Sequence, residues 1–177
     1  MYFRLAYSTI ILLGLSIAIS GYIFDRSLWL DEAFLGINLI ERNYLELFDS
    51  LDHNQVAPIL FLLLEKLLSE SFNYSDYALR AIPFSSFMGC IVLTYIVSKQ
   101  LIPNEDAPIL AVCLISLSPI FLSYAHEIKP YMSDAFTTLL LLYISLRLKL
   151  TTRWLFILAT TGVIAVFFSN TSTIILS

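Results

Sequence analysis

Long stretches without a charged residue constrain this chain more than any other feature of its sequence. Uncharged or nearly uncharged runs cover residues 5–24, 81–98, 107–125, 130–146 and 154–177, and Asp134 is the one charge inside them. A helix needs roughly 20 apolar residues to cross the hydrocarbon core of a bilayer. The runs therefore predict an all-α membrane protein with about five transmembrane helices.

The composition supports the same class. Charged residues make up 14% of the chain and hydrophobic residues 58%, whereas soluble domains carry roughly 25% charged residues. These values exclude a water-soluble globule and a disordered chain, and the net charge of −4 argues against a nucleic-acid partner. Cys90 and Cys113 both lie in apolar runs, which predicts small packing residues and no disulfide.

The first run permits two interpretations. Arg4 gives it a basic start and Ala18-Ile19-Ser20 resembles a signal-peptide cleavage site. The run is also long enough to span a membrane, and four more apolar runs follow it. We therefore expect a retained first span.

The segment 25–80 differs from the rest, because it holds 10 of the 14 acidic residues. Apolar side chains recur in it at helical spacing, at Ile37, Ile40, Tyr44, Leu47 and Leu51. This pattern predicts an amphipathic helix lying on a membrane surface. Residues 56–64 form an apolar run that is too short to span and predict a second interfacial helix.

The basic residues predict the orientation of the chain. With a cytoplasmic N-terminus, the inner segments hold most of the short-loop cations, namely Arg4, Lys99, Arg147, Lys149 and Arg153. The outer turn 126–130 then holds only Lys129. Lys and Arg are enriched in cytoplasmic loops. We therefore expect a multi-pass membrane protein with loop 25–80 and turn 126–130 together on the outer face.

Several polar residues on that face each allow a functional and a structural interpretation. Asp31 and Glu32 follow the first span and suit a base or a cation ligand, or a solvated helix start with Asp31 as N-cap. His53 is typical of a polar turn or a ligand-binding loop. Arg80 precedes the second span and suits a phosphate-binding guanidinium or an interfacial anchor. The turn from Tyr124 to Tyr131 contains an imidazole, a carboxylate and an ammonium within four residues, which favours function at a membrane boundary.

Four motifs in register resemble the membrane glycosyltransferases of the GT-C fold. The similar branch is that of the dolichyl-phosphate-mannose protein mannosyltransferases and the aminoarabinose transferases. The motifs are Trp29-Leu30-Asp31-Glu32-Ala33, Gln55-Val56-Ala57-Pro58, Ala78-Leu79-Arg80 and the turn from Tyr124 to Tyr131. His126 and Lys129 stand where that family usually has arginines. Family members have more than twice as many spans, so residues 1–177 resemble the single N-terminal transmembrane region of such an enzyme.

The resemblance implies inverting transfer of a sugar from a polyprenyl-phosphate donor to an acceptor on the outer or luminal face. It implies catalytic roles for Asp31, Glu32 and Glu127, and phosphate binding by Arg80 and Lys129. Substrate contacts are expected from His53, Gln55, His126 and Tyr131. No cofactor is expected, although Asp31, Glu32, His53 and Glu127 leave a divalent metal open.

Two other functions stay open from the sequence. A non-catalytic membrane subunit would hold a lipid phosphate or pair with a second chain. A transporter needs charges inside several spans, and only Asp134 meets that description. The partners expected for the enzyme are the polyprenyl-phosphate-linked sugar, membrane lipid and an unknown lipid, glycan or protein acceptor.

Overall fold

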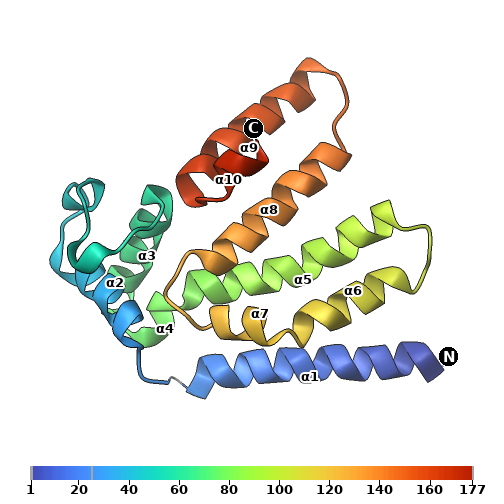
Figure 1. Ribbon diagram of the computed structural model, residues 1–177, viewed down its shortest axis with the longest axis horizontal. Coiled ribbons are helices and arrows are strands. Elements are labelled where there is room, and N and C mark those ends of the chain that lie inside the picture. Colours follow the sequence, from blue (N-terminus) through green and yellow to red (C-terminus); the bar gives the residue numbers. More distant parts are fainter. Residues whose placement is uncertain (1, 25, 177) are drawn as a thin grey trace.

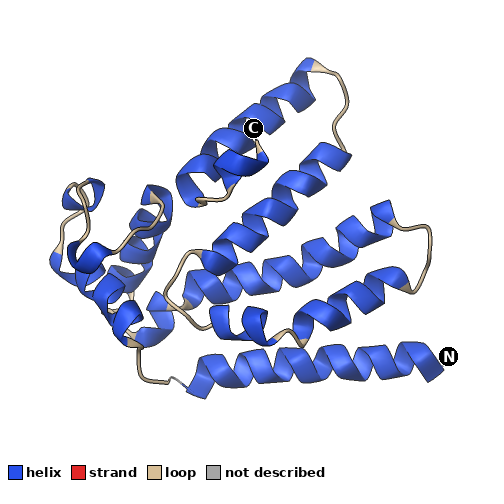
Figure 2. Ribbon diagram, viewed as in Figure 1, coloured by secondary structure: helices blue, strands red, loops and turns tan. Residues whose placement is uncertain are grey.

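The computed structural model describes residues 2–24 and 26–176. All regular elements within these residues are helices, as Figure 2 shows. The predicted all-α class is thereby confirmed.

The long helices lie side by side in a fan (Figure 1). Helix α1 (Tyr2–Phe24) packs against α6 (Ala107–Ser116), and α6 packs against α5 (Ala81–Leu101). On its other side α5 packs against α8 (Tyr131–Leu146), which in turn packs against α9 (Thr152–Phe168).

The segment between α1 and α5 folds into a group of short helices at one end of the fan (Figure 1). It contains α2 (Leu30–Glu41), the 3₁₀ turns η1 (Glu46–Phe48) and η2 (Asp52–Asn54), α3 (Ile59–Ser71) and α4 (Asp76–Leu79). The turn before α8 lies at the same end, whereas the loops 102–106 and 147–151 lie at the opposite end. The two polar segments expected to meet are therefore neighbours.

Two helices, α1 over Leu5–Phe24 and α5, are long and apolar enough to cross a membrane. Helices α6, α8 and α9 are apolar but shorter, with 10, 16 and 17 residues. Two of the five predicted spans therefore coincide with helices of spanning length, and the other three runs form shorter helices.

The run 107–125 is broken into two helices, α6 and α7 (Pro119–Tyr124), which corrects the prediction of one continuous span. Pro119 explains the break, because its ring clashes with the carbonyl four residues earlier and removes a backbone donor. Ser118, directly before it, adopts the extended conformation that a following proline favours.

The last run also departs from its prediction. Helix α9 ends at Phe168, and the chain turns at residues 169–171 into the four-residue α10 (Ser172–Ile175). The Ser169 and Thr171 hydroxyls lie 3.1 Å apart in this turn. Short polar side chains of this kind bond locally and compete with helical hydrogen bonds.

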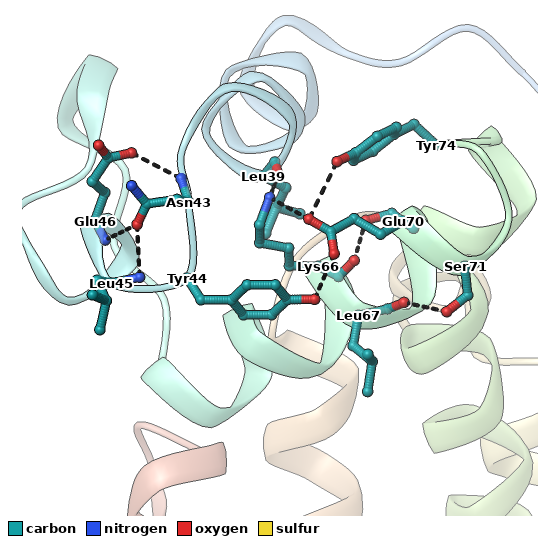
Figure 3. Close-up of polar contacts among 11 residues, drawn as sticks. Leu39, Asn43, Tyr44, Leu45, Glu46, Lys66, Leu67, Glu70, Ser71 and Tyr74 are labelled. Carbon is teal, nitrogen blue, oxygen red and sulfur yellow. Dashed lines mark hydrogen bonds and ion pairs between the residues drawn. The ribbon is translucent and has the colours of Figure 1, made fainter.

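The predicted amphipathic helix through Leu51 is wrong beyond Glu41, where α2 ends. Local side-chain bonds replace the next helical turn, as Figure 3 shows. The Asn43 Oδ1 accepts hydrogen bonds from the backbone N–H groups of Leu45 and Glu46, and the Glu46 carboxylate accepts one from the backbone N–H of Asn43. Asparagine competes with helices in this way.

Helix α3 corresponds to the second predicted interfacial helix and begins directly after Pro58. Its buried face joins α2 and α4 in one apolar cluster, formed by Leu35, Leu39, Leu47, Phe61, Leu62, Leu79 and Ile128. Because Ile128 belongs to this cluster, the short helices are packed directly onto the turn before α8.

Candidate functional site

Three polar side chains from three separate segments meet in one hydrogen-bonded cluster. The Lys129 ammonium lies 2.7 Å from Asp31 Oδ2 and donates a 2.5 Å hydrogen bond to Gln55 Oε1. The Gln55 amide completes the triangle, because its Nε2 donates a 2.9 Å hydrogen bond to Asp31 Oδ1. Both carboxylate oxygens of Asp31 are therefore held in a defined orientation.

This triangle forms part of the wall of a cavity of about 290 Å³. Other parts of the wall come from the start of α8 and from the turn after α9, and include Tyr131, Asp134 and Asn170. The Tyr131 ring is half exposed and packs against Tyr124 at a centroid distance of 4.8 Å. Four of the nine site residues expected from the sequence, Asp31, Gln55, Lys129 and Tyr131, thus line one cavity.

Asp31 and Lys129 differ sharply in exposure. The side chain of Asp31 is 65% exposed, whereas that of Lys129 is 9% exposed. Hydrogen bonds from Lys129 and Gln55 lower the pKa of Asp31 below its ordinary value, so Asp31 is ionised at neutral pH. Lys129 has three ammonium protons, and two have acceptors among the described residues, which leaves one for a ligand oxygen.

Glu32 is a structural neighbour of the cavity and does not line it. It is buried, and its carboxylate accepts hydrogen bonds from the Arg26 guanidinium at 2.8 Å, the Trp29 N–H at 2.9 Å and the Ile128 N–H at 3.1 Å. The bond to Trp29 satisfies a free N–H at the start of α2, as in a capping box. Glu32 therefore fixes the start of α2 against the turn before α8.

A second set of contacts fixes the other end of α2, and Figure 3 shows it. The Lys66 ammonium, which is 3% exposed, donates a 2.8 Å hydrogen bond to the Leu39 carbonyl and lies 2.9 Å from the Glu70 carboxylate. The Tyr44 hydroxyl donates a 2.6 Å bond to Glu70, which is the main cause of the lowered pKa of that carboxyl. A cation near the last carbonyls of a helix also favours its dipole.

Arg80 does not line the cavity, although it was expected to bind phosphate there. It is 1% exposed, and its Nη2 donates a 2.5 Å hydrogen bond to the Arg26 carbonyl oxygen. Arg80 joins α4 to α5 and so ties that junction to the chain before α2. The structure thus gives it a position inside the fold and no access to a ligand in the cavity.

Glu127, His126 and His53 also lie away from the cavity wall. Glu127 accepts a 2.7 Å hydrogen bond from the Ser123 hydroxyl. The His126 ring fills the space beside Gly21, and its Nε2 donates a 2.7 Å bond to the Ala18 carbonyl of α1. Burial lowers the pKa of His126, which favours its neutral form. His53 stacks on Phe34 with ring centroids 4.1 Å apart.

Sequence reasoning missed Asn54 and Asn170 as lining residues. Asn170 lines the cavity because the chain turns after Phe168. In the sequence, the polar triplet Asn170-Thr171-Ser172 inside an apolar run is the feature that could have indicated this turn. Asn54 directly precedes Gln55 and adopts a left-handed backbone with φ 54°. Within the described residues no group of three His, Cys, Asp or Glu side chains is placed to hold a metal ion.

Comparisons with known proteins give no direct assignment: no protein family, no curated protein and no solved structure matches this chain.

Proposed function

We propose that this chain belongs to a membrane glycosyltransferase of the GT-C type. It transfers a sugar from a polyprenyl-phosphate donor to a hydroxyl acceptor at the outer face of the membrane and inverts the anomeric carbon. The observation that carries the proposal is the Asp31–Gln55–Lys129 cluster on the wall of one cavity. It places an ionised, exposed carboxylate beside an ammonium that has one proton left for a ligand.

The arrangement suits the two needs of this reaction. The acceptor hydroxyl gives its proton to Asp31 while its oxygen bonds to the anomeric carbon, and the bond from that carbon to the phosphate oxygen breaks. The electron pair leaves with the lipid phosphate, where Lys129 stabilises the developing negative charge. A lipid phosphate is a good leaving group, so the reaction needs no strong general acid.

Lys129 also couples donor binding to the strength of the base. In the free protein it lowers the pKa of Asp31, which makes the carboxylate a weak base. A bound phosphate shares the ammonium and weakens its bond to Asp31, so the pKa of Asp31 rises. Because a general base works best with a pKa near the operating pH, the donor itself activates Asp31.

The proposed membrane orientation is supported by the distribution of basic residues between the two ends of the fan. Lys99, Arg147, Lys149 and Arg153 belong to the end that carries the N-terminus, and the candidate site belongs to the opposite end. Single cysteines at the exposed positions Ser50, Asn104 and Thr151, in a variant without Cys90 and Cys113, test it. An impermeant thiol reagent added outside should label only position 50. Outside labelling of position 104 or 151 contradicts the orientation.

The catalytic proposal is tested in the natural protein with a panel of polyprenyl-phosphate sugars. Asp31→Asn should lower turnover by about 10²–10⁴-fold, as expected for loss of a general base. It should not weaken donor binding, because the phosphate no longer competes with a carboxylate for Lys129. Lys129→Ala should weaken donor binding by about 10–100-fold, because a charge-assisted hydrogen bond contributes about 1.5–3 kcal/mol. The matched controls are the exposed Glu41→Gln on α2 and Lys149→Ala at the opposite end, which should change neither quantity.

Three outcomes of this experiment are decisive. Wild-type turnover in Asp31→Asn contradicts the base assignment. Unchanged donor affinity in Lys129→Ala contradicts the phosphate assignment. Donor binding that depends on Lys129, without transfer of any sugar in the panel, supports the non-catalytic lipid-phosphate-binding module.

A further inference from the structure

A second cavity adjoins the candidate site and has a different chemical character. Its volume is about 440 Å³, within the range of roughly 300–1,000 Å³ that is usual for ligand pockets. Asn54, Gln55 and Val56 line both cavities, so this three-residue segment is a shared wall. The Gln55 amide on that wall is the one that holds Asp31.

The backbone of the shared wall is strained. His53 and Asn54 are consecutive non-glycine residues with φ of 57° and 54°. This conformation costs roughly 1–2 kcal/mol for a residue such as His53 and less for asparagine, which tolerates it. The stacking of His53 on Phe34 helps to hold this segment against α2. Strain of this kind is concentrated at ligand sites, where the surrounding structure maintains it.

The side chains of the second cavity combine an exposed aromatic ring with short polar groups. Phe48 is 66% exposed, and Asp49, Ser50 and Asn54 lie around the same space. None of these three polar side chains makes a hydrogen bond to another described residue. An aromatic face with unengaged carboxylate, hydroxyl and amide groups matches a sugar ring, which has apolar C–H faces and hydroxyl edges.

The charged side chains that line the two cavities favour ligands of different charge. The candidate site contains the Lys129 ammonium beside the Asp31 and Asp134 carboxylates, whereas no basic side chain is among the described residues that line the second cavity. Its one charge is the Asp49 carboxylate, which disfavours an anionic ligand. A phosphate-linked donor therefore suits the first cavity, and a neutral hydroxylated ligand suits the second.

We propose that the second cavity binds the acceptor and that this acceptor is a neutral carbohydrate. The inference rests on the proposed transferase function, because it assigns the second substrate of that reaction. An acceptor seated on Phe48 would direct a hydroxyl past Gln55 toward Asp31. A peptide acceptor is less suited, since the short polar groups surround one flat ring and the described residues offer no strand edge for backbone pairing.

Binding of neutral trisaccharides tests this directly. The probes are mannotriose, maltotriose and galactotriose, measured by saturation-transfer NMR on the natural protein in phosphatidylcholine nanodiscs, because sugar-headed detergents compete. At least one probe should bind, and the anionic trigalacturonate should not. Phe48→Ala should weaken binding by about two- to tenfold, since an aromatic contact contributes about 0.5–1.5 kcal/mol. Phe72→Ala is the matched control, because Phe72 is 62% exposed and lines neither cavity.

A second variant separates recognition from folding. Asn54→Gly keeps the left-handed backbone available and removes the amide, so it should lower trisaccharide affinity with little effect on thermal stability. Failure of all three probes to bind overturns the inference, as does binding that is unchanged in Phe48→Ala and Asn54→Gly. Binding of a serine- and threonine-rich peptide that depends on Phe48 overturns the carbohydrate assignment.

The donor arm of the experiment tests the proposed function separately. Binding of a polyprenyl phosphate should depend on Lys129 and be unchanged in Phe48→Ala. If Lys129→Ala leaves donor binding intact while Phe48→Ala lowers trisaccharide binding, the transferase proposal fails and the carbohydrate site stands. The converse result retains the donor site and rejects the acceptor site.

Discussion

Replacing Glu65 should make the protein more stable at neutral pH. This residue lies on the buried face of α3 with 0% exposure, and neither of its carboxylate oxygens has a hydrogen-bond partner. Burial raises its pKa well above the ordinary value of 4.5, so the folded protein holds the carboxyl in its neutral form.

The sign of the pH dependence follows from this raised pKa. Above pH 4.5 the unfolded chain releases the proton of Glu65, and the folded chain keeps it up to the raised pKa. The contribution of Glu65 to stability is therefore complete below the ordinary pKa and is lost as pH rises through the folded pKa. The loss is about 1.4 kcal/mol per pH unit. This loss continues until the pH reaches the folded pKa, which lies well above 4.5.

Glu65→Gln keeps the size of the side chain and cannot titrate. As the pH rises above 5, the unfolding temperature of the wild type should therefore fall relative to that of Glu65→Gln. The expected shift is about 2–4 °C per kcal/mol lost. Glu65→Leu should be more stable still by about 1–3 kcal/mol, because it removes an unsatisfied buried polar group. The measurement is intrinsic-fluorescence unfolding in detergent, with the exposed Glu41→Gln as control. Parallel pH curves for wild type and Glu65→Gln would refute the buried neutral carboxyl.

Three further substitutions test the helix packing and the buried hydrogen bonds. Gly14→Ala should destabilise the protein by about 1–3 kcal/mol, because a Cβ there would overlap the Ser116 backbone of α6. Gly36→Ala is its matched control and should stabilise α2 by about 0.5–1 kcal/mol, since no atom lies within 4 Å of its Cβ position. Equal unfolding temperatures for the two variants would contradict the close approach of α1 and α6. Glu32→Ala should lower the free energy of unfolding by about 2–4 kcal/mol, because Arg26 and the Ile128 N–H lose their acceptor. An unchanged unfolding temperature would show that these hydrogen bonds do not stabilise the fold.

The helical class and the starts of the main helices follow from local sequence. Runs of 17 to 24 residues with at most one charge have few other stable forms. Pro58 and Pro119 mark helix starts, since Pro58 directly precedes α3 and Pro119 is the first residue of α7. The helix ends were harder to predict. Glu41 and Phe168 each precede a short polar stretch whose local hydrogen bonds outweigh the apolar pattern. Ser116 lies three residues before Pro119, which breaks the helix.

The candidate site could be predicted only in part, because burial depends on tertiary packing. Asp31, Gln55, Lys129 and Tyr131 were expected from separate motifs, and they line one cavity. Whether they bind a donor stays a prediction. The sequence around Arg80 also predicted a phosphate-binding residue. In the structure the side chain is buried, because α4 packs against α3 and α5 around it. The burial of Glu65 could not be predicted from the sequence. An acidic residue directly before Lys66 suggests two solvent-exposed charges.

The adjacent carboxylates Asp31 and Glu32 at the start of α2 make different contacts with the turn before α8. Two consecutive residues of α2 hold two consecutive residues of the turn before α8: Glu32 accepts the Ile128 N–H, and Asp31 pairs with the Lys129 ammonium. The buried bond therefore sets where Lys129 can reach, while the exposed bond is the one that a ligand can exchange. Loss of Glu32 should consequently reduce both stability and donor binding, whereas loss of the Asp31 charge should reduce turnover without weakening donor binding. The difference between these two patterns assigns the two carboxylates without reference to any relative.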